Sequence, residues 1–286
     1  MKHLSINENL FIILFHILFF IFFLLFIIHW LMFRVDRWPF GSWATAGMMG
    51  QGLDGLECAA MAFRFQGVDF IEFDGLLSED ELLVRTNTRA FIEDNLIPII
   101  EQCNRDGRFP RELVRPMGEL GFYGATLDGY GCAGLNHVEY GLMTQELERG
   151  DSGIRSFVSV QSALVMYPIY TFGSEEQRSF WLPQMATGQK LGCFGLTEPD
   201  FGSNPGGMRT RARRDGDDYI LNGEKMWITS GSLADVAVIW AKVEEVGVPQ
   251  ESWRVRGFLV ETDRPGFRAT DVHGKWSLRA SVTSGL

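Results

Sequence analysis

Apolar residues recur at helical spacing between residues 78 and 188. Ser78 followed by Glu81, and Ser174 followed by Gln177, have the spacing of capping boxes, in which two side chains bond each other's backbone N–H groups at a helix start. The first apolar stretch follows the box at Ser78–Glu81. We therefore expect helices over residues 81–100, 110–121, 137–150, 153–173 and 175–188.

Proline and short polar residues mark where these helices should begin or end. Pro98 lies inside the first apolar stretch and should bend or end that helix, because it lacks a backbone N–H. Pro110 and Gly121 suit the first turn and the end of the second helix. Asp151 or Ser152 should cap the helix that follows.

The pattern changes near residue 190 to short runs of Val, Ile, Phe and Trp separated by Gly, Pro and Asp, which is typical of strands. Asn222-Gly223 predicts a type I′ turn that joins the strands on its two sides as a hairpin. Helices followed by strands favour an α+β fold over a doubly wound sheet. We expect strands within residues 190–199, 217–231, 234–243 and 254–262.

Residues 10–33 are almost wholly apolar, and as a helix these 24 residues would cross about 30 Å of hydrocarbon. Trp30, Arg34 and Arg37 would suit a membrane interface. A transmembrane helix is one interpretation, and a mispredicted protein start is the other. After this segment, the patterns predict a helical domain over residues 78–188 and a β domain from about residue 190 onward.

Charge and cysteine content exclude several classes of function. The net charge is −10 and no basic stripe is present, so nucleic-acid binding has no electrostatic support. The four cysteines show no CxxC spacing, which argues against a zinc site and against a disulfide framework. We expect no metal site.

A GxGxxG pattern covers residues 129–134. In a dinucleotide-binding fold this pattern follows a buried strand and opens a βαβ unit. The preceding residues are too short and too rich in glycine for such a strand, and no second strand follows the next helix. We interpret this segment as a connector between helices.

Arg155 lies on an otherwise apolar helix, seven residues after Glu148 and one turn before Ser159. Burying an arginine there requires an anionic partner. A structural Glu148–Arg155 ion pair is one interpretation. The other is that Glu148 orients Arg155, whose planar guanidinium receives a substrate carboxylate together with the Ser159 hydroxyl. Residue chemistry alone leaves both open.

Two segments of the β domain suit the binding of a flat ring system. Residues 193–203 run from an apolar strand into a loop of Thr, Glu, Gly and Ser, which offers hydroxyl and backbone N–H donors. Trp227 and Thr229 would share one face of a strand and form a flat wall with a hydroxyl at its edge. An ordinary sheet with a core tryptophan is the alternative.

The order of four segments resembles the acyl-CoA dehydrogenase family, and most closely its glutaryl-CoA members. These segments are ELERGDSGIRSFVSVQSALVMYPIYTFGSEEQR, LGCFGLTEPDFGSNPGGM, YILNGEKMWIT and GKWSLRAS. The resemblance runs from Val68 to Leu286, and residues 1–67 remain an unassigned extension. It implies a helical domain over residues 68–189, a β-barrel domain over residues 190–286 and a further C-terminal helical domain, which together enclose FAD. It also implies α,β-dehydrogenation of an acyl-CoA, and for glutaryl-CoA oxidative decarboxylation to crotonyl-CoA in lysine and tryptophan degradation.

The resemblance implies roles for individual residues. In the family, one segment binds FAD and another binds the substrate, with Arg155 and Ser159 matching the pair that holds the distal carboxylate. The implied FAD-binding residues are Phe194, Gly195, Leu196, Thr197, Gly202, Ser203, Trp227, Ile228 and Thr229. The implied substrate-binding residues are Glu148, Arg155, Ser156, Ser159 and Ser203. Asn204 departs from the family, which usually has Asp there.

The family's catalytic glutamate and its C-terminal helical domain would lie beyond Leu286, so we assign no catalytic base. We expect this chain to be a fragment with a truncated barrel that binds FAD poorly and has no dehydrogenase activity by itself. The complete enzyme would be a homotetramer that passes electrons to electron-transferring flavoprotein, in a mitochondrial matrix or a bacterial cytoplasm. The alternatives are a dehydrogenase of another short-chain acyl-CoA and an inactive binding protein tethered to a membrane through residues 10–33.

Overall fold

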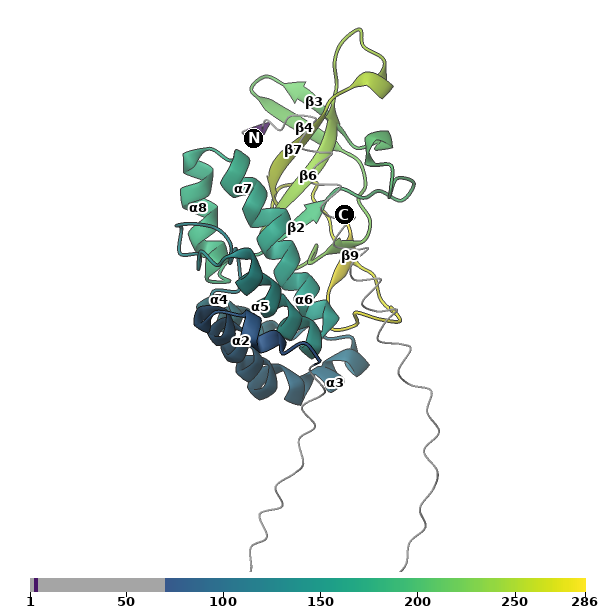
Figure 1. Cartoon of the computed structure of the whole chain (residues 1–286). Coiled ribbons are helices and arrows are strands. Elements are labelled where there is room, and N and C mark those ends of the chain that lie inside the picture. The colour runs from purple at the N-terminus through teal and green to yellow at the C-terminus, as the bar shows by residue number, and fades with distance from the viewer. Residues whose placement is uncertain (1–2, 5–69) are drawn as a thin grey trace, which may run out of the picture. The chain divides into compact units, whose positions relative to one another are not determined.

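The computed structural model describes residues 3–4 and 70–286. Its helices precede its main strands along the chain, as Figure 1 shows, and the α+β prediction is confirmed. Residues 10–33 lie outside the described residues, and so does most of the extension over 1–67. Within the described part, no helix is both long enough and apolar enough to cross a bilayer.

The helix starts follow the caps expected from the sequence. Helix α2 (Glu79–Phe91) begins at Ser78, whose hydroxyl accepts from the Glu81 N–H at 3.3 Å while Glu81 Oε2 accepts from the Ser78 N–H at 2.8 Å. Ser174 and Gln177 form the same box before α8 (Glu175–Ala186). Asn136 caps α5 (His137–Gly150) with a third box that we did not predict.

Two prolines lie in helices that continue through them, so the prediction that Pro98 could end its helix is wrong. The π-helical segment η2 (Ile92–Leu96) joins α2 to α3 (Ile97–Asp106), which has Pro98 in its first turn. In the same way η4 (Val160–Met166) joins α6 (Ser152–Ser159) to α7 (Tyr167–Phe172), which has Pro168 in its first turn. A widened turn shifts the hydrogen-bond ladder, so the missing proline N–H leaves no broken helix.

The remaining helical elements are short. Two of them, η3 (Arg111–Leu113) and α4 (Val114–Glu119), lie where the second helix was predicted. The others are η1 (Phe73–Leu76), η5 (Pro205–Gly207) and η6 (Gln250–Ser252). The GxGxxG residues 129–134 form a connector between α4 and α5 in which Gly129, Gly131 and Gly134 have positive φ angles. Within residues 70–286 no strand precedes this connector, which confirms that it is not a dinucleotide-binding turn.

The larger sheet has six strands in the order β1 (His3–Leu4), β7 (Val255–Glu261), β6 (Val236–Val243), β3 (Arg211–Asp215) and β4 (Asp218–Asn222), with β2 (Gly192–Gly195) also paired to β6. Strands β2 and β3 both run parallel to β6, β2 beside residues 236–239 and β3 beside residues 242–243. The chain between β2 and β3 therefore leaves one edge of β6 and returns to it further along. The described strands do not close into a barrel.

The hairpin predicted at Asn222-Gly223 is wrong. Strand β4 pairs with β3 instead, through a two-residue turn in which Gly216 has a φ of 61°. Gly223 has no positive φ, and a Cβ there would lie 2.6 Å from the Thr210 Cα, so close approach of backbone explains the glycine. Strand β5 (Ile228–Thr229) pairs with β9 (Thr283–Gly285) in a three-stranded sheet with β8 (Thr270–Asp271).

The helices pack on the sheet through η4. The Gln161 amide joins the two, because its Nε2 donates to the Lys190 carbonyl at 3.0 Å and its Oε1 accepts from the Gly192 N–H at 2.9 Å. Gln161 is buried, and both the nitrogen and the oxygen of its side-chain amide have a hydrogen-bond partner. This contact fixes the position of β2 and of the loop that follows it.

Candidate functional site

Helical spacing gives α6 one buried face and one half-buried face, and the predicted substrate-binding residues of this helix lie on the half-buried face. Asp151 caps it, with its carboxylate accepting from the N–H groups of Gly153 at 2.8 Å and Ile154 at 3.0 Å. The buried face carries Ile154, Phe157 and Val158. The half-buried face carries Arg155, Ser156 and Ser159, so the helix presents these three polar side chains together.

Glu148 contacts Arg155 from one side only. The Arg155 Nε donates to Glu148 Oε2 at 2.6 Å, and the Ser152 hydroxyl donates to the other carboxylate oxygen at 2.5 Å. The Arg155 side chain is 19% exposed. Among the described residues, the terminal nitrogens of its guanidinium bond no other side chain, so a planar pair of donors remains for an anion.

Tyr140 is a neighbour of this group that sequence reasoning missed. It lies on α5, and its pKa is raised by burial, an effect opposed by a hydrogen bond with Ser159 and by the charge of Arg155. Tyr140 therefore lies near Arg155 and Ser159, the two residues that the family resemblance singles out. Its position three residues after a helix start gave no sign of this.

The first predicted flavin segment leaves β2 along the edge of β6. Phe194 and Gly195 lie in β2, and Leu196 and Thr197 follow it half-buried. Gly202 and Ser203 lie further out on the exposed part of the loop. Asp200 pairs with Arg209 at 3.1 Å, which holds the far ends of this loop together.

The second predicted segment differs from expectation at Trp227. Only Ile228 and Thr229 form a strand, while Trp227 has a φ of 63° and Ser230 the same value. Strand alternation therefore does not place Trp227 and Thr229 on one face. The backbone turns the Trp227 ring outward instead, and it is 57% exposed. An ordinary core tryptophan, the alternative interpretation, is excluded by that exposure.

Lys225 and Glu198 join these two segments, although neither was predicted as a site residue. The Lys225 Nζ donates to Glu198 Oε1 at 2.8 Å and to the Leu196 carbonyl at 3.0 Å. The Met226 N–H donates to the Thr197 carbonyl at 2.9 Å. Both charged side chains are at most 5% exposed.

The Glu198 carboxylate has two further donors, the N–H groups of Arg209 at 2.6 Å and Thr210 at 2.9 Å. Burial by itself would raise the pKa of Glu198, but the hydrogen bonds from Lys225, Thr210 and Arg209 hold that pKa below its ordinary value. Burial lowers the pKa of Lys225, and Glu198 opposes this shift. Glu198 is therefore held as an anion by its surroundings.

The substrate helix and the second segment are linked through α3. The Asp151 carboxylate accepts from Asn104 Nδ2 at 3.0 Å, and the Asn104 carbonyl accepts from Arg279 Nε at 2.7 Å. Arg279 lies shortly before β9, the strand that pairs Thr283 with Thr229. The structure thus ties the cap of α6 to the neighbour of β5 by two side chains.

The loop after β2 has exposed backbone N–H groups that suit a flavin or a phosphate ligand. In the part of the chain that is described, the backbone N–H groups of Gly202 and Ser203 make no hydrogen bond, and both residues are exposed. No atom lies within 4 Å of a Cβ placed at Gly202. Open backbone donors beside the hydroxyls of Thr197 and Ser203 suit a ligand rich in acceptors.

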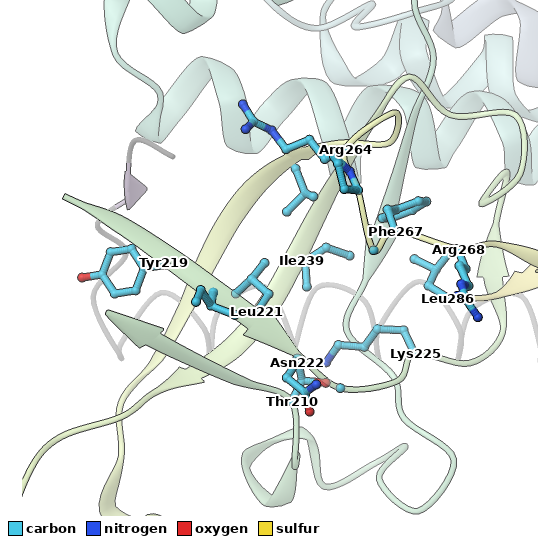
Figure 2. Close-up of a pocket in the computed structure, with 15 residues that line it drawn as sticks. Thr210, Tyr219, Leu221, Asn222, Lys225, Ile239, Arg264, Phe267, Arg268 and Leu286 are labelled. Carbon is cyan, nitrogen blue, oxygen red and sulfur yellow. The ribbon is translucent and has the colours of Figure 1, made fainter. Parts of the chain in front are cut away.

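A cavity of about 390 Å³ lies elsewhere in the β domain (Figure 2). It is lined by β4, by Ile239 of β6 and by the residues from Arg264 to Arg268, and none of the predicted site residues lines it. Tyr219, Leu221, Phe267 and Leu286 also pack on the apolar core of this domain, so the cavity is an opening into that core. It carries no arrangement of catalytic groups.

Comparison with known proteins gives two matches to family models. The model described as acyl-CoA dehydrogenase, N-terminal domain, matches residues 78–189, and the one described as acyl-CoA dehydrogenase, middle domain, matches residues 193–286. Together they cover more than half of the chain.

Individual relatives agree with these models. The mitochondrial short-chain specific acyl-CoA dehydrogenase of Rattus norvegicus is 32% identical over 85% of this chain and 57% of its own length. A crystal structure of a glutaryl-CoA dehydrogenase from Mycobacterium smegmatis in complex with FADH2 is 56% identical, with a TM-score of 0.71 over 75% of this chain and 53% of that one.

A chain in a structure titled electron transferring flavoprotein of Acidaminococcus fermentans is 34% identical, with a TM-score of 0.68 over 76% of this chain and 56% of that one. The chain spans a little over half the length of these relatives. On the two family models and these identities, the chain belongs to the acyl-CoA dehydrogenase family of oxidoreductases.

Proposed function

We propose that this chain forms the FAD-binding and substrate-binding part of an acyl-CoA dehydrogenase that acts on glutaryl-CoA. The observation that carries the proposal is the geometry of Arg155. Glu148 holds the guanidinium through Nε and leaves its terminal donors uncommitted among the described residues. Simple acyl chains end in a methyl group and need no cation, whereas a glutaryl chain ends in a carboxylate that a guanidinium can bind in two places.

Arg155, Ser156 and Ser159 share the half-buried face of α6, where partial exclusion of water strengthens a charge-assisted hydrogen bond. Ser159 adds a hydroxyl donor one turn from Arg155. Glu148 keeps the guanidinium plane fixed before substrate arrives, so little orientational freedom is lost on binding. These residues would bind the tail of the substrate and set its position.

FAD would be held by residues 194–203 and 227–229, and when bound it supplies the electron acceptor for α,β-dehydrogenation. Thr197, Ser203 and Thr229 offer hydroxyls, and Gly202 and Ser203 offer backbone N–H groups. The exposed ring of Trp227 would cover one side of the flavin. Ser203 would also lie near the CoA thioester.

Assignments beyond the site rest on the family resemblance, and two of the relatives support parts of them. The M. smegmatis protein is described with FADH2, and the rat protein is named as mitochondrial. We place the complete enzyme in a mitochondrial matrix or a bacterial cytoplasm, as a homotetramer that passes electrons to electron-transferring flavoprotein. Oxidative decarboxylation of glutaryl-CoA would place it in lysine and tryptophan degradation.

The test compares the binding of glutaryl-CoA and butyryl-CoA by the FAD-loaded chain, by isothermal titration, for the wild type and for Arg155→Ala. Loss of a charged hydrogen-bond pair should weaken glutaryl-CoA binding about 10- to 150-fold. Butyryl-CoA binding should stay within about twofold, because its methyl terminus makes no ionic contact.

A short-chain acyl-CoA substrate is the second candidate, and the rat relative named for such substrates favours it. It predicts tighter binding of butyryl-CoA than of glutaryl-CoA by the wild type. Equal loss of both ligands in Arg155→Ala would also contradict the glutaryl-CoA proposal, since the arginine would then serve the fold of the site and not the recognition of a carboxylate.

A further inference from the structure

Two segments implied in flavin binding are far apart in sequence, and the contacts between them converge on Glu198 and Lys225. Residues 194–203 begin in β2, and residues 227–229 end in β5. Lys225 Nζ bonds both Glu198 and the Leu196 carbonyl, one residue from Thr197. The next residue, Met226, bonds Thr197 through its backbone. Lys225 thus contacts the first segment at two points and directly precedes Met226 and Trp227.

Glu198 also closes the base of the loop. Strands β2 and β3 lie along the same edge of β6 with a gap between them, and the loop spans that gap. The N–H groups of Arg209 and Thr210, at the returning end, donate to the Glu198 carboxylate, and the Thr210 carbonyl accepts from Lys242 of β6 at 2.9 Å. One carboxylate therefore fixes the departure and the return of the loop.

Lys225 is fixed in turn by its own backbone. Its N–H donates to the Leu286 carbonyl at 3.0 Å, and its carbonyl accepts from the Leu286 N–H at 2.8 Å. Figure 2 shows Lys225 and Leu286 near each other at one end of the cavity. The side chain then reaches from this anchored position to Leu196 and Glu198.

From this geometry we propose that Glu198 and Lys225 are positioning residues for the flavin, a buried ion pair that holds the two flavin-binding segments at a fixed separation. The inference rests on the proposed binding of FAD to these segments. Both side chains are at most 5% exposed, and in this proposal they act on the flavin through the neighbouring residues Thr197 and Trp227. Breaking it should let the two segments shift independently, and FAD should lose contacts on one of them.

A second ion pair of the same length provides the control. Lys190 Nζ lies 2.8 Å from Asp235 Oδ1, but these side chains are 37% and 34% exposed. Both pairs join a lysine to a carboxylate in or next to the larger sheet. The Lys190–Asp235 pair does not touch either flavin-binding segment. Its removal therefore measures the effect of losing an ion pair that does not position these segments.

The test is an equilibrium titration of the full chain with FAD, followed by flavin fluorescence and by the shape of the visible absorption band. The variants are Glu198→Gln, Lys225→Met and the double variant, with Asp235→Asn, Lys190→Met and their double as the control set. Circular dichroism and thermal denaturation define a temperature at which each variant is folded. If a single variant fails to fold, the double variant remains informative, because replacing both partners leaves no unpaired buried charge.

Each single substitution at Glu198 or Lys225 should raise the Kd for FAD about 10-fold or more and alter the absorption band, while the double variant should lose less than the sum of the singles. The control set should stay within about twofold. An unchanged Kd in folded Glu198 and Lys225 variants, or equal losses in both sets, would overturn the inference. If the wild type binds no FAD, the proposed function fails first, and this inference fails with it.

Discussion

The Arg155–Glu148 ion pair lies in the helical domain and the Lys225–Glu198 ion pair lies in the β domain. The two pairs differ in which of their hydrogen-bond donors and acceptors remain without a partner. Arg155 and Glu148 are 2.6 Å apart with side chains 19% and 37% exposed. Lys225 and Glu198 are 2.8 Å apart with side chains 3% and 5% exposed. The separations are nearly equal, so distance does not distinguish their roles.

The difference lies in the remaining donors and acceptors. In the β domain, the Glu198 carboxylate takes two backbone N–H groups besides Lys225, and Lys225 takes a carbonyl besides Glu198. In the helical domain, Arg155 uses one nitrogen for Glu148 and keeps a planar edge for an anion. A pair with all its partners in place stabilises structure, whereas a pair with an open edge can recognise a ligand.

The largest effect should come from breaking the buried pair. Lys225→Met leaves the Glu198 carboxylate buried without its cation, which should lower the free energy of unfolding by about 3–5 kcal/mol. Arg155→Met should lower it by only about 1 kcal/mol or less, because Glu148 can turn to solvent. Urea denaturation followed by circular dichroism measures both. Similar losses in the two variants would remove the distinction between the pairs.

The next effect concerns the orientation of Arg155. Glu148→Gln keeps the shape of the side chain but weakens its hold on Nε, and we expect glutaryl-CoA binding to fall about 5- to 10-fold, less than for Arg155→Ala. Butyryl-CoA serves as the matched ligand that lacks the carboxylate. A Glu148→Gln variant that binds glutaryl-CoA as the wild type does would show that the ion pair does not orient the arginine.

Acid should affect the buried pair in a defined direction. The folded pKa of Glu198 lies below its ordinary value of 4.5, so its contribution to stability is complete above that value. The contribution disappears as the pH falls through the folded pKa. Stability between neutral pH and about pH 3 should therefore fall less steeply in Glu198→Gln than in the wild type. Parallel unfolding curves across this range would contradict the assignment.

The smallest effect is expected at the exposed control pair. Lys190→Met should change the free energy of unfolding by less than about 1 kcal/mol, because water solvates Asp235 when the lysine is removed. The measurement uses the same urea titration as Lys225→Met. A loss comparable to that of Lys225→Met would mean that exposure does not separate the two kinds of pair.

Helix starts were predictable because their causes are local. Ser78 with Glu81 and Ser174 with Gln177 form boxes within four residues, and no distant contact is needed to define them. The hairpin at Asn222-Gly223 failed for the opposite reason. Thr210, twelve positions before Asn222, requires glycine at 223 through close packing, and the turn forms at Gly216 instead. Tertiary packing overrode a strong local pattern there.

One contact of the candidate site was predictable from the sequence, and another was not. Glu148 and Arg155 are close in sequence, and the structure joins them as expected. Glu198 and Lys225 stand 27 positions apart, and their pairing depends on how β2, β3 and β5 are arranged. Trp227 was placed in a strand because its neighbours favour one, but its backbone has a positive φ. A pattern along one segment does not contain such contacts.

The π-helical segment η4 also keeps the buried residues of α6, η4 and α7 on one side of the helix. The buried residues of this region recur over four turns from residue 154 to residue 169. Because an α-helix advances about 100° per residue, fifteen residues overshoot four turns by roughly 60°. A turn that holds extra chain absorbs the overshoot, so the buried stripe stays straight along α6, η4 and α7. Deleting one residue between Val160 and Met166 would rotate everything downstream by about 100° and carry Ile169 off the packed side. The buried residues of this region are Ile154, Phe157, Val158, Gln161, Ser162, Val165, Met166, Pro168 and Ile169.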